Sequence, residues 1–230
     1  MQSASIIQRL IQAGLKKRLL SILVVLPLFL LAVYFGGLAY LLVLAAGGGL
    51  AIKEMHDMLS LRYQGLRLIG LDLLGGVYII VPCIFLIYIR GVEGGLFLTL
   101  FLFCCIWSSD TLAYLGGIVF GGPKLAPSIS PKKTESGMFC AVFGTSFLCY
   151  VSLYIIFGEA DPWSSAAAIY IAWIAQMGDL LESWLKRHTG VKDSGTILPG
   201  HGGVLDRVDG LLLVCWSYIV LWRLFDIIDL

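Results

Sequence analysis

The sequence predicts an all-α fold, a polytopic transmembrane helical bundle, and three observations support this. Hydrophobic residues make up 59% of the chain and charged residues 13%, whereas a soluble domain has about 25% charged residues. The mean hydropathy is +0.91. Long apolar runs, such as 19–34 and 137–157, match the roughly 20 apolar residues that a helix needs to cross a bilayer. This composition excludes a soluble globular domain.

Seven apolar segments are expected to cross the membrane as one bundle: 19–36, 38–59, 68–89, 95–120, 137–157, 164–187 and 203–223. The fourth segment is long enough to be broken near Asp110. Residues 1–18 are predicted to form a polar, basic cytoplasmic helix, which lies on the lipid surface. Residues 19–107 then carry only hydrophobic helices, and residues 108–230 carry the candidate site.

The distribution of cationic residues predicts the orientation in the membrane. With the N-terminus in the cytoplasm, Arg90 and Arg223 lie outside, and the other 14 of the 16 Lys and Arg residues lie inside. Cytoplasmic loops of membrane proteins carry such an excess of positive charge. We therefore expect the polar segments described below to form a cavity that opens to the cytoplasmic side.

The six cysteines indicate packing rather than metal binding or disulfide formation. They are scattered, with no CxxC pair, and most lie within apolar segments. A free cysteine in such a place behaves as a small hydrophobic residue.

Charged residues within or beside a membrane segment are costly, and each is by default a functional hypothesis. Asp110 lies inside an apolar run and shares a helix face with Tyr114 and Gly117. It either caps a broken helix or contributes to a polar site. The segment that follows, "GGPKLAPSISPKKT", is predicted to be a Pro/Gly-rich loop with three lysines, which either lies near anionic lipid headgroups or contributes to the same site.

A second polar group lies in "QMGDLLESWLKR", residues 176–187. Asp179, Glu182, Ser183 and Lys186 follow the spacing i, i+3, i+4, i+7 and therefore project from one helix face. A helix end that emerges into water would also tolerate this pattern. The depth of Asp179 relative to Lys186 and Arg187 favours a functional stripe.

The third group is "LPGHGGVLDRVDG", residues 198–210. Glycines around His201 allow the backbone to approach a ligand, and successive amides in such a loop can cradle phosphate oxygens. Asp206 and Asp209 follow at the start of the last helix and are hard oxygen ligands suited to Mg²⁺. The three groups together indicate a site for a polyanion with a divalent metal, such as a nucleoside triphosphate, a phospholipid headgroup, or both.

The segment "SWLKRHTGVKDSGTILPGHGGVLDRVD" resembles the signature of the CDP-diacylglycerol synthases, or phosphatidate cytidylyltransferases. The matching positions are Ser183, Lys186, Arg187, Lys192, Asp193, Pro199, Gly200, His201, Gly202, Gly203, Asp206, Arg207 and Asp209. "SDTLAYLGGIVFG" (109–121), "SPKKT" (130–134) and Gly178-Asp179 are similar to further family elements. The resemblance covers about residues 108–210.

This resemblance implies the reaction of CTP with phosphatidic acid to give CDP-diacylglycerol and pyrophosphate, with Mg²⁺ as cofactor and a second cation left open. It implies a bacterial cytoplasmic (inner) membrane protein whose active site faces the cytoplasm. Its partners would be the two substrates and the lipid bilayer, not nucleic acid, and a homodimer is compatible with it.

The implied metal ligands are Asp179 and Asp206, with Asp209 next, and the implied catalytic residues are these three with Lys186 and Arg207. Implied substrate-binding residues are Asp110, Lys132, Lys133, Ser183, Arg187, Lys192, His201, Gly202 and Gly203. His201 either binds phosphate or holds the glycine loop, and the two roles stay open.

Two positions depart from the family pattern. After "SPKKT" the family has an apolar residue, then Glu and Gly, whereas this chain has Glu135, Ser136 and Gly137. Lys124 in "GGPK" is also an uncertain counterpart of a family Gly-Lys.

Other classes of protein are less consistent with the sequence. A transporter would place carboxylates near the midplane in paired inverted segments, and none is visible. A CDP-archaeol synthase or a CTP-dependent polyprenol kinase is a nearer alternative. The Asp-Gly-x-x-Ala-Arg motif of CDP-alcohol phosphotransferases is absent.

Overall fold

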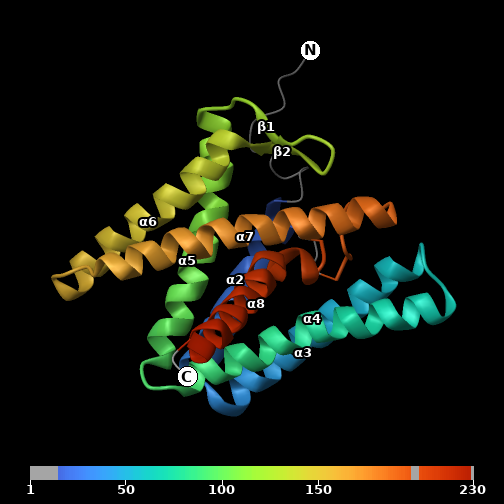
Figure 1. The fold of residues 1–230 in the computed structure, drawn as a ribbon, viewed down its shortest axis with the longest axis horizontal. Helices are drawn as coiled ribbons and strands as arrows, with labels where there is room; N and C mark the ends of the chain where they lie inside the picture. The colour runs from blue at the N-terminus through green and yellow to red at the C-terminus, as the bar shows by residue number, and fades with distance from the viewer. Residues whose placement is uncertain (1–14, 198–201, 229–230) are drawn as a thin grey trace.

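The computed structural model describes residues 15–197 and 202–228, which form seven helices and one small hairpin (Figure 1). The helices are α2 (Leu15–Phe35), α3 (Gly37–Ser60), α4 (Gly65–Gly91), α5 (Gly95–Val119), α6 (Glu135–Phe157), α7 (Pro162–Thr189) and α8 (Leu205–Ile228). The strands are β1 (Lys124–Ala126) and β2 (Ser130–Thr134). Residues 1–14, most of the predicted surface helix, lie outside the described residues, and residues 15–18 begin α2.

Each of the seven predicted apolar segments coincides with one helix, within a few residues at either end. Four of the described helices, α3 to α6, are long and apolar enough to cross a membrane. The prediction of a helical membrane protein is confirmed, and the number of seven spans stays a prediction. α7 differs from α3 to α6 because its second half carries the predicted polar stripe.

Within residues 95–134 the structure excludes one of the two alternatives for Asp110 and corrects the predicted loop. α5 continues unbroken through Asp110, so this residue is not a helix cap. The neighbouring hydroxyls do not interrupt the helix. Thr111 Oγ1 donates to the carbonyl of Trp107 within α5 at 2.8 Å, and the buried Ser109 donates from Oγ to the carbonyl of Ala172 in α7 at 3.4 Å. The predicted loop is instead an antiparallel β1–β2 hairpin, a small exception to the all-α prediction.

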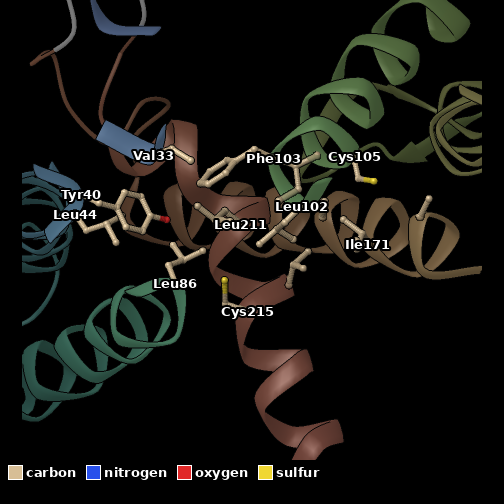
Figure 2. Packing of buried hydrophobic residues seen from close by; sticks show 14 residues of the cluster. Val33, Tyr40, Leu44, Leu86, Leu102, Phe103, Cys105, Ile171, Leu211 and Cys215 are labelled. Atoms are coloured by element: carbon tan, nitrogen blue, oxygen red, sulfur yellow. The ribbon is translucent and has the colours of Figure 1, made fainter. Parts of the chain in front are cut away.

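The core lies where α8 crosses the bundle. Buried residues of α2, α3, α4, α5 and α7 surround Leu211, Val214 and Cys215 of α8. Figure 2 shows these side chains converging from several helices, with Leu211 and Cys215 between Leu86 of α4 and Leu102 of α5. A second cluster joins α3 and α4 to Leu205 and Leu212 of α8. α8 is therefore fixed on two sides, and its first turn is buried against α3.

The hairpin lies beside α5, α6 and α7 at one end of the bundle (Figure 1). Thr134 ends β2 and caps α6, since its Oγ1 accepts a hydrogen bond from the amide of Gly137 at 3.1 Å. Arg187 of α7 donates to the carbonyl of Ile129 between the strands at 3.3 Å. These contacts hold the lysine-bearing strand β2 against α7.

Candidate active site

The polar stripe predicted on α7 is present, and most of it is buried. Glu182 is 6% exposed, Ser183 8% and Lys186 8%, whereas Asp179 is half-buried. Ser183 donates a hydrogen bond from Oγ to Asp179 Oδ1 at 3.2 Å. The interpretation of the stripe as a solvated helix end is therefore wrong, because its members point into the protein rather than into water.

Asp206, in the first turn of α8, is the most connected carboxylate of the site. Lys186 Nζ lies 2.6 Å from its Oδ1, and its Oδ2 accepts hydrogen bonds from the amides of Ser194 at 3.0 Å and Gly203 at 2.9 Å. Negative charge is favourable at a helix N-terminus, where backbone amides are unpaired. Asp206 thus joins α7, the segment after α7 and the start of α8.

Two glycines allow α7 and α8 to approach closely at the site. A Cβ atom on Gly178 would lie 2.7 Å from the carbonyl oxygen of Asp209 and 2.8 Å from Gly210 Cα. A Cβ on Gly210 would lie 3.0 Å from the carbonyl oxygen of Ala175. Small residues are the usual means of close packing between membrane helices. Here they bring Asp209 within electrostatic reach of Asp179 and Glu182.

Lys133 comes to the site from the hairpin. Its Nζ lies 2.8 Å from Asp179 Oδ2 and 3.1 Å from Gln176 Oε1. Gln176 in turn donates from Nε2 to Asp110 Oδ1, also at 3.1 Å. Asp110, Lys133 and Asp179 therefore lie around Gln176, and their common role in one active site stays a prediction.

Gln176 was not predicted from the sequence. It is buried and lies three residues before Asp179, so it extends the stripe on α7 by one helical turn. The stripe itself was the signal that could have found it, because an amide in an apolar membrane segment needs a polar partner.

The structure does not bring all the predicted phosphate-binding residues into this cluster. Lys132 and Lys192 are exposed, whereas Arg207, although exposed at the start of α8, lies within electrostatic reach of Asp110. Arg187 contacts backbone carbonyls of Ile129 and Val191. Gly202 and Gly203 border Asp206, and His201 lies outside the described residues.

The two departures from the family pattern have local structural roles. Ser136 donates a hydrogen bond from Oγ to the carbonyl of Gly121, which fixes the start of α6 against the turn after α5. Glu135 is exposed in the first turn of α6, where a carboxylate complements the helix dipole. Lys124 lies in β1, opposite Thr134 in the sheet register.

The donor set fits a divalent cation bound together with a phosphate. Within residues 15–197 and 202–228, no group of three His, Cys, Asp or Glu residues is arranged as a complete metal site. Mg²⁺, however, usually binds one or two carboxylates plus substrate phosphates and water. Glu182 Oε1 lies 3.2 Å from Lys186 Nζ, yet neither of its buried oxygens receives a hydrogen bond from the described residues. Lys186 is also shared with Asp206, so Glu182 and the three aspartates beside it keep negative charge that a cation would neutralise.

Comparisons with known proteins agree with this geometry. The profile of the Cytidylyltransferase family matches residues 68–225. The chain is 37% identical to a phosphatidate cytidylyltransferase of Rickettsia felis over 204 residues, covering 85% of this chain and 87% of the relative. It is 38% identical to that of Rickettsia conorii over 205 residues, covering 85% and 86%. It is 48% identical to that of Brucella abortus biovar 1 over 128 residues, covering 54% and 46%.

The family resemblance found in the signature is thereby confirmed, and the match extends beyond residues 108–210 into the N-terminal helices. A nucleotidyltransferase is expected to gather phosphate-binding cations and carboxylates at one place, as α7, α8 and β2 do here. The chain is an enzyme and belongs to the cytidylyltransferase family.

Proposed function

We propose that this chain is a phosphatidate cytidylyltransferase, which converts CTP and phosphatidic acid into CDP-diacylglycerol and pyrophosphate in phospholipid biosynthesis. The observation that carries the proposal is the convergence of four carboxylates from α7 and α8 with Lys133 of the hairpin and Lys186. The names of relatives that align over most of their length support the lipid substrate.

The reaction requires positioning and charge neutralisation more than covalent catalysis. A phosphate oxygen of phosphatidate attacks the α-phosphorus of CTP, and a new P–O bond forms. The bond from the α-phosphorus to the oxygen that bridges it to the β-phosphorus breaks, and pyrophosphate leaves with that electron pair. The negative charge on the phosphate oxygens is what the enzyme must neutralise.

The cationic side chains supply part of this neutralisation. Lys133 and Lys186 are held at the site by ion pairs with Asp179 and Asp206. A lysine acts on phosphate as a point charge, and an arginine can form two parallel hydrogen bonds. The exposed Lys192 and Arg207 are proposed to bind the nucleotide phosphates from the side of the site that faces water.

Mg²⁺ is proposed as the cofactor, and bound there it would neutralise charge on the phosphates. Asp179, Asp206 and Asp209 remain the proposed ligands. Glu182 is proposed as a further ligand, because neither of its buried oxygens receives a hydrogen bond from the described residues. The hydrogen bonds from Ser194 and Gly203 orient Asp206, as donors around a ligating carboxylate commonly do.

The proposed location is the bacterial inner membrane, with seven spans and the site open to the cytoplasm. The excess of Lys and Arg in the loops on that side supports this orientation. A homodimer stays a prediction, which light scattering of the purified protein in detergent would test.

The decisive assay measures pyrophosphate release and labelled CDP-diacylglycerol by the purified protein in mixed micelles. We expect both products only when CTP, phosphatidic acid and Mg²⁺ are all present. Asp179→Asn should abolish them, whereas Asp57→Asn, which changes an exposed aspartate of α3, should not. Absence of product from folded wild-type protein would refute the proposal.

The same assay separates the alternative acceptors. A CTP-dependent polyprenol kinase would transfer the terminal phosphoryl group and release CDP instead of pyrophosphate. A CDP-archaeol synthase would release pyrophosphate only with an ether-linked lipid phosphate. Transport of an ion without any of these products would support the transporter alternative.

A further inference from the structure

Glu54 is a buried carboxylate that none of the recognised motifs contains. It lies on α3, one of the helices apolar enough to cross the membrane, and is 2% exposed. It also lies outside residues 68–225, the part matched by the family profile. A buried charge of this kind is costly unless the surrounding structure satisfies it.

The start of α8 supplies the partners of Glu54. Its Oε1 accepts a hydrogen bond from the amide of Val204 at 3.0 Å, and its Oε2 accepts one from the amide of Leu205 at 2.8 Å. Ser194 Oγ donates to Oε2 at 3.3 Å. Amides at a helix N-terminus have no partner within the helix, and a side chain near in sequence usually caps them. Here the acceptor comes from a helix 150 residues earlier in the chain.

Two glycines of the signature segment leave the space that Glu54 occupies. A Cβ atom on Gly195 would lie 2.5 Å from Glu54 Oε1, and one on Gly203 would lie 2.6 Å from Oε2. The sequence alone suggested that Gly203 allows the backbone to approach a ligand. The structure gives this glycine a second reason, which is close contact with a carboxylate of α3.

Glu54 and Asp206 hold the same two segments. The first segment contains Ser194, whose Oγ contacts Glu54, and the second is the start of α8, where the amides of Val204 and Leu205 contact Glu54. The two segments contact Asp206 through the amides of Ser194 and Gly203. Glu54 and Asp206 therefore share Ser194 and the start of α8 as hydrogen-bond partners.

We propose that Glu54 is a positioning residue of the active site, which fixes the first turn of α8 and residues 194–195 so that Asp206 and Lys186 keep the geometry that cytidylyl transfer requires. This inference rests on the proposed function. It assigns a role in the chemistry to α3, one of the N-terminal helices.

The test is Glu54→Gln, which keeps the shape but turns one oxygen acceptor into an NH₂ donor. That group would face a backbone N–H, so one of the two amides would lose its partner. We expect kcat/KM for CTP to fall by about 10- to 100-fold, the range for an unsatisfied buried donor. We also expect the Mg²⁺ concentration for half-maximal activity to rise, because the position of Asp206 changes.

A readout independent of activity is amide hydrogen exchange. Exchange should become faster at residues 194–195 and 203–206 and stay unchanged in α5 and α6. Glu93→Gln is the matched control, because Glu93 is exposed in the turn between α4 and α5, and it should change neither readout. Ser194→Ala removes one longer hydrogen bond and should shift both readouts in the same direction by a smaller amount.

Wild-type activity and exchange in Glu54→Gln would overturn the inference. So would faster exchange throughout the protein with an unchanged Mg²⁺ requirement, because that is the result of a general folding role. If Glu54→Gln does not fold, Ser194→Ala decides between these outcomes. Lack of cytidylyl transfer by the wild-type protein would refute the proposed function instead, and the exchange measurement would still test whether Glu54 fixes α8.

Discussion

Lys186 carries the positive charge between two buried carboxylates, and Lys186→Met removes that charge while keeping an apolar side chain of similar length. Its Nζ lies 2.6 Å from Asp206 Oδ1 and 3.2 Å from Glu182 Oε1. The exposed fractions of the three side chains are 10%, 8% and 6% for Lys186, Asp206 and Glu182. The variant therefore leaves two carboxylates without a counter-charge in a place that water barely reaches.

The expected cost follows from these distances. At an effective dielectric constant near 20, each pair attracts by about 5–6 kcal/mol, and the cost of removing the charges from water offsets part of this. Removing one partner of a buried pair costs about 3–5 kcal/mol, because the remaining charge stays buried. For a chain of this size, that predicts a melting temperature lower by roughly 6–20 °C.

The assay is thermal unfolding in detergent, followed with a thiol-reactive dye. Cys105 and Cys215 are buried and become reactive when the bundle opens. The matched control is Lys53→Met, since Lys53 forms an i, i+4 pair with Asp57 in which both side chains are more than half exposed. We expect little change there, because exposed pairs contribute little to stability.

A second variant tests the physical reason. Adding Glu182→Gln to Lys186→Met removes one of the two unpaired charges, and we expect it to recover part of the lost melting temperature. The reasoning would be refuted if Lys186→Met melted within about 3 °C of the wild type, below the shift derived above. It would also be refuted if Lys53→Met destabilised the protein equally.

Three further predictions concern the site and its orientation. Lys133→Met should lower kcat/KM at least about tenfold in the pyrophosphate assay, because a charge-assisted contact at the site is lost. Lys132→Met changes an exposed lysine and should lower kcat/KM less. Gly178→Ala should abolish turnover, because the added methyl group forces α8 away from α7. Gly47→Ala is the control and should be active, because there is open space around its Cβ position. Equal activities of the two variants would show that close helix contact is not required. In a chain without native cysteines, Thr196→Cys should react with a membrane-impermeant thiol reagent only from the cytoplasmic side. Labelling from the other side would contradict the predicted topology.

Much of the fold was predictable because the forces that form it are local. Apolar runs of about 20 residues correspond to helices α2 to α8. For α3 to α6, which are apolar enough to cross a membrane, the physical reason is that a backbone within lipid must satisfy its own hydrogen bonds. The stripe on α7 was also predictable, since i, i+3, i+4 and i+7 positions share a face in any helix. Within residues 95–134 the helix was predicted, but its continuity through Asp110 and the pairing of β1 with β2 were not.

The sequence by itself determined the class of protein, the helices and the identity of the chemical groups, because composition, periodicity and the spaced signature are properties of neighbouring residues. Only the tertiary structure decided which groups meet. Lys133 and Asp179 are 46 positions apart, and Glu54 contacts an amide 151 positions away. The first contact depends on the packing of β2 against α7, and the second on the burial of Leu205 against α3. No spacing within one segment encodes such packing, since it joins elements that are distant in the chain.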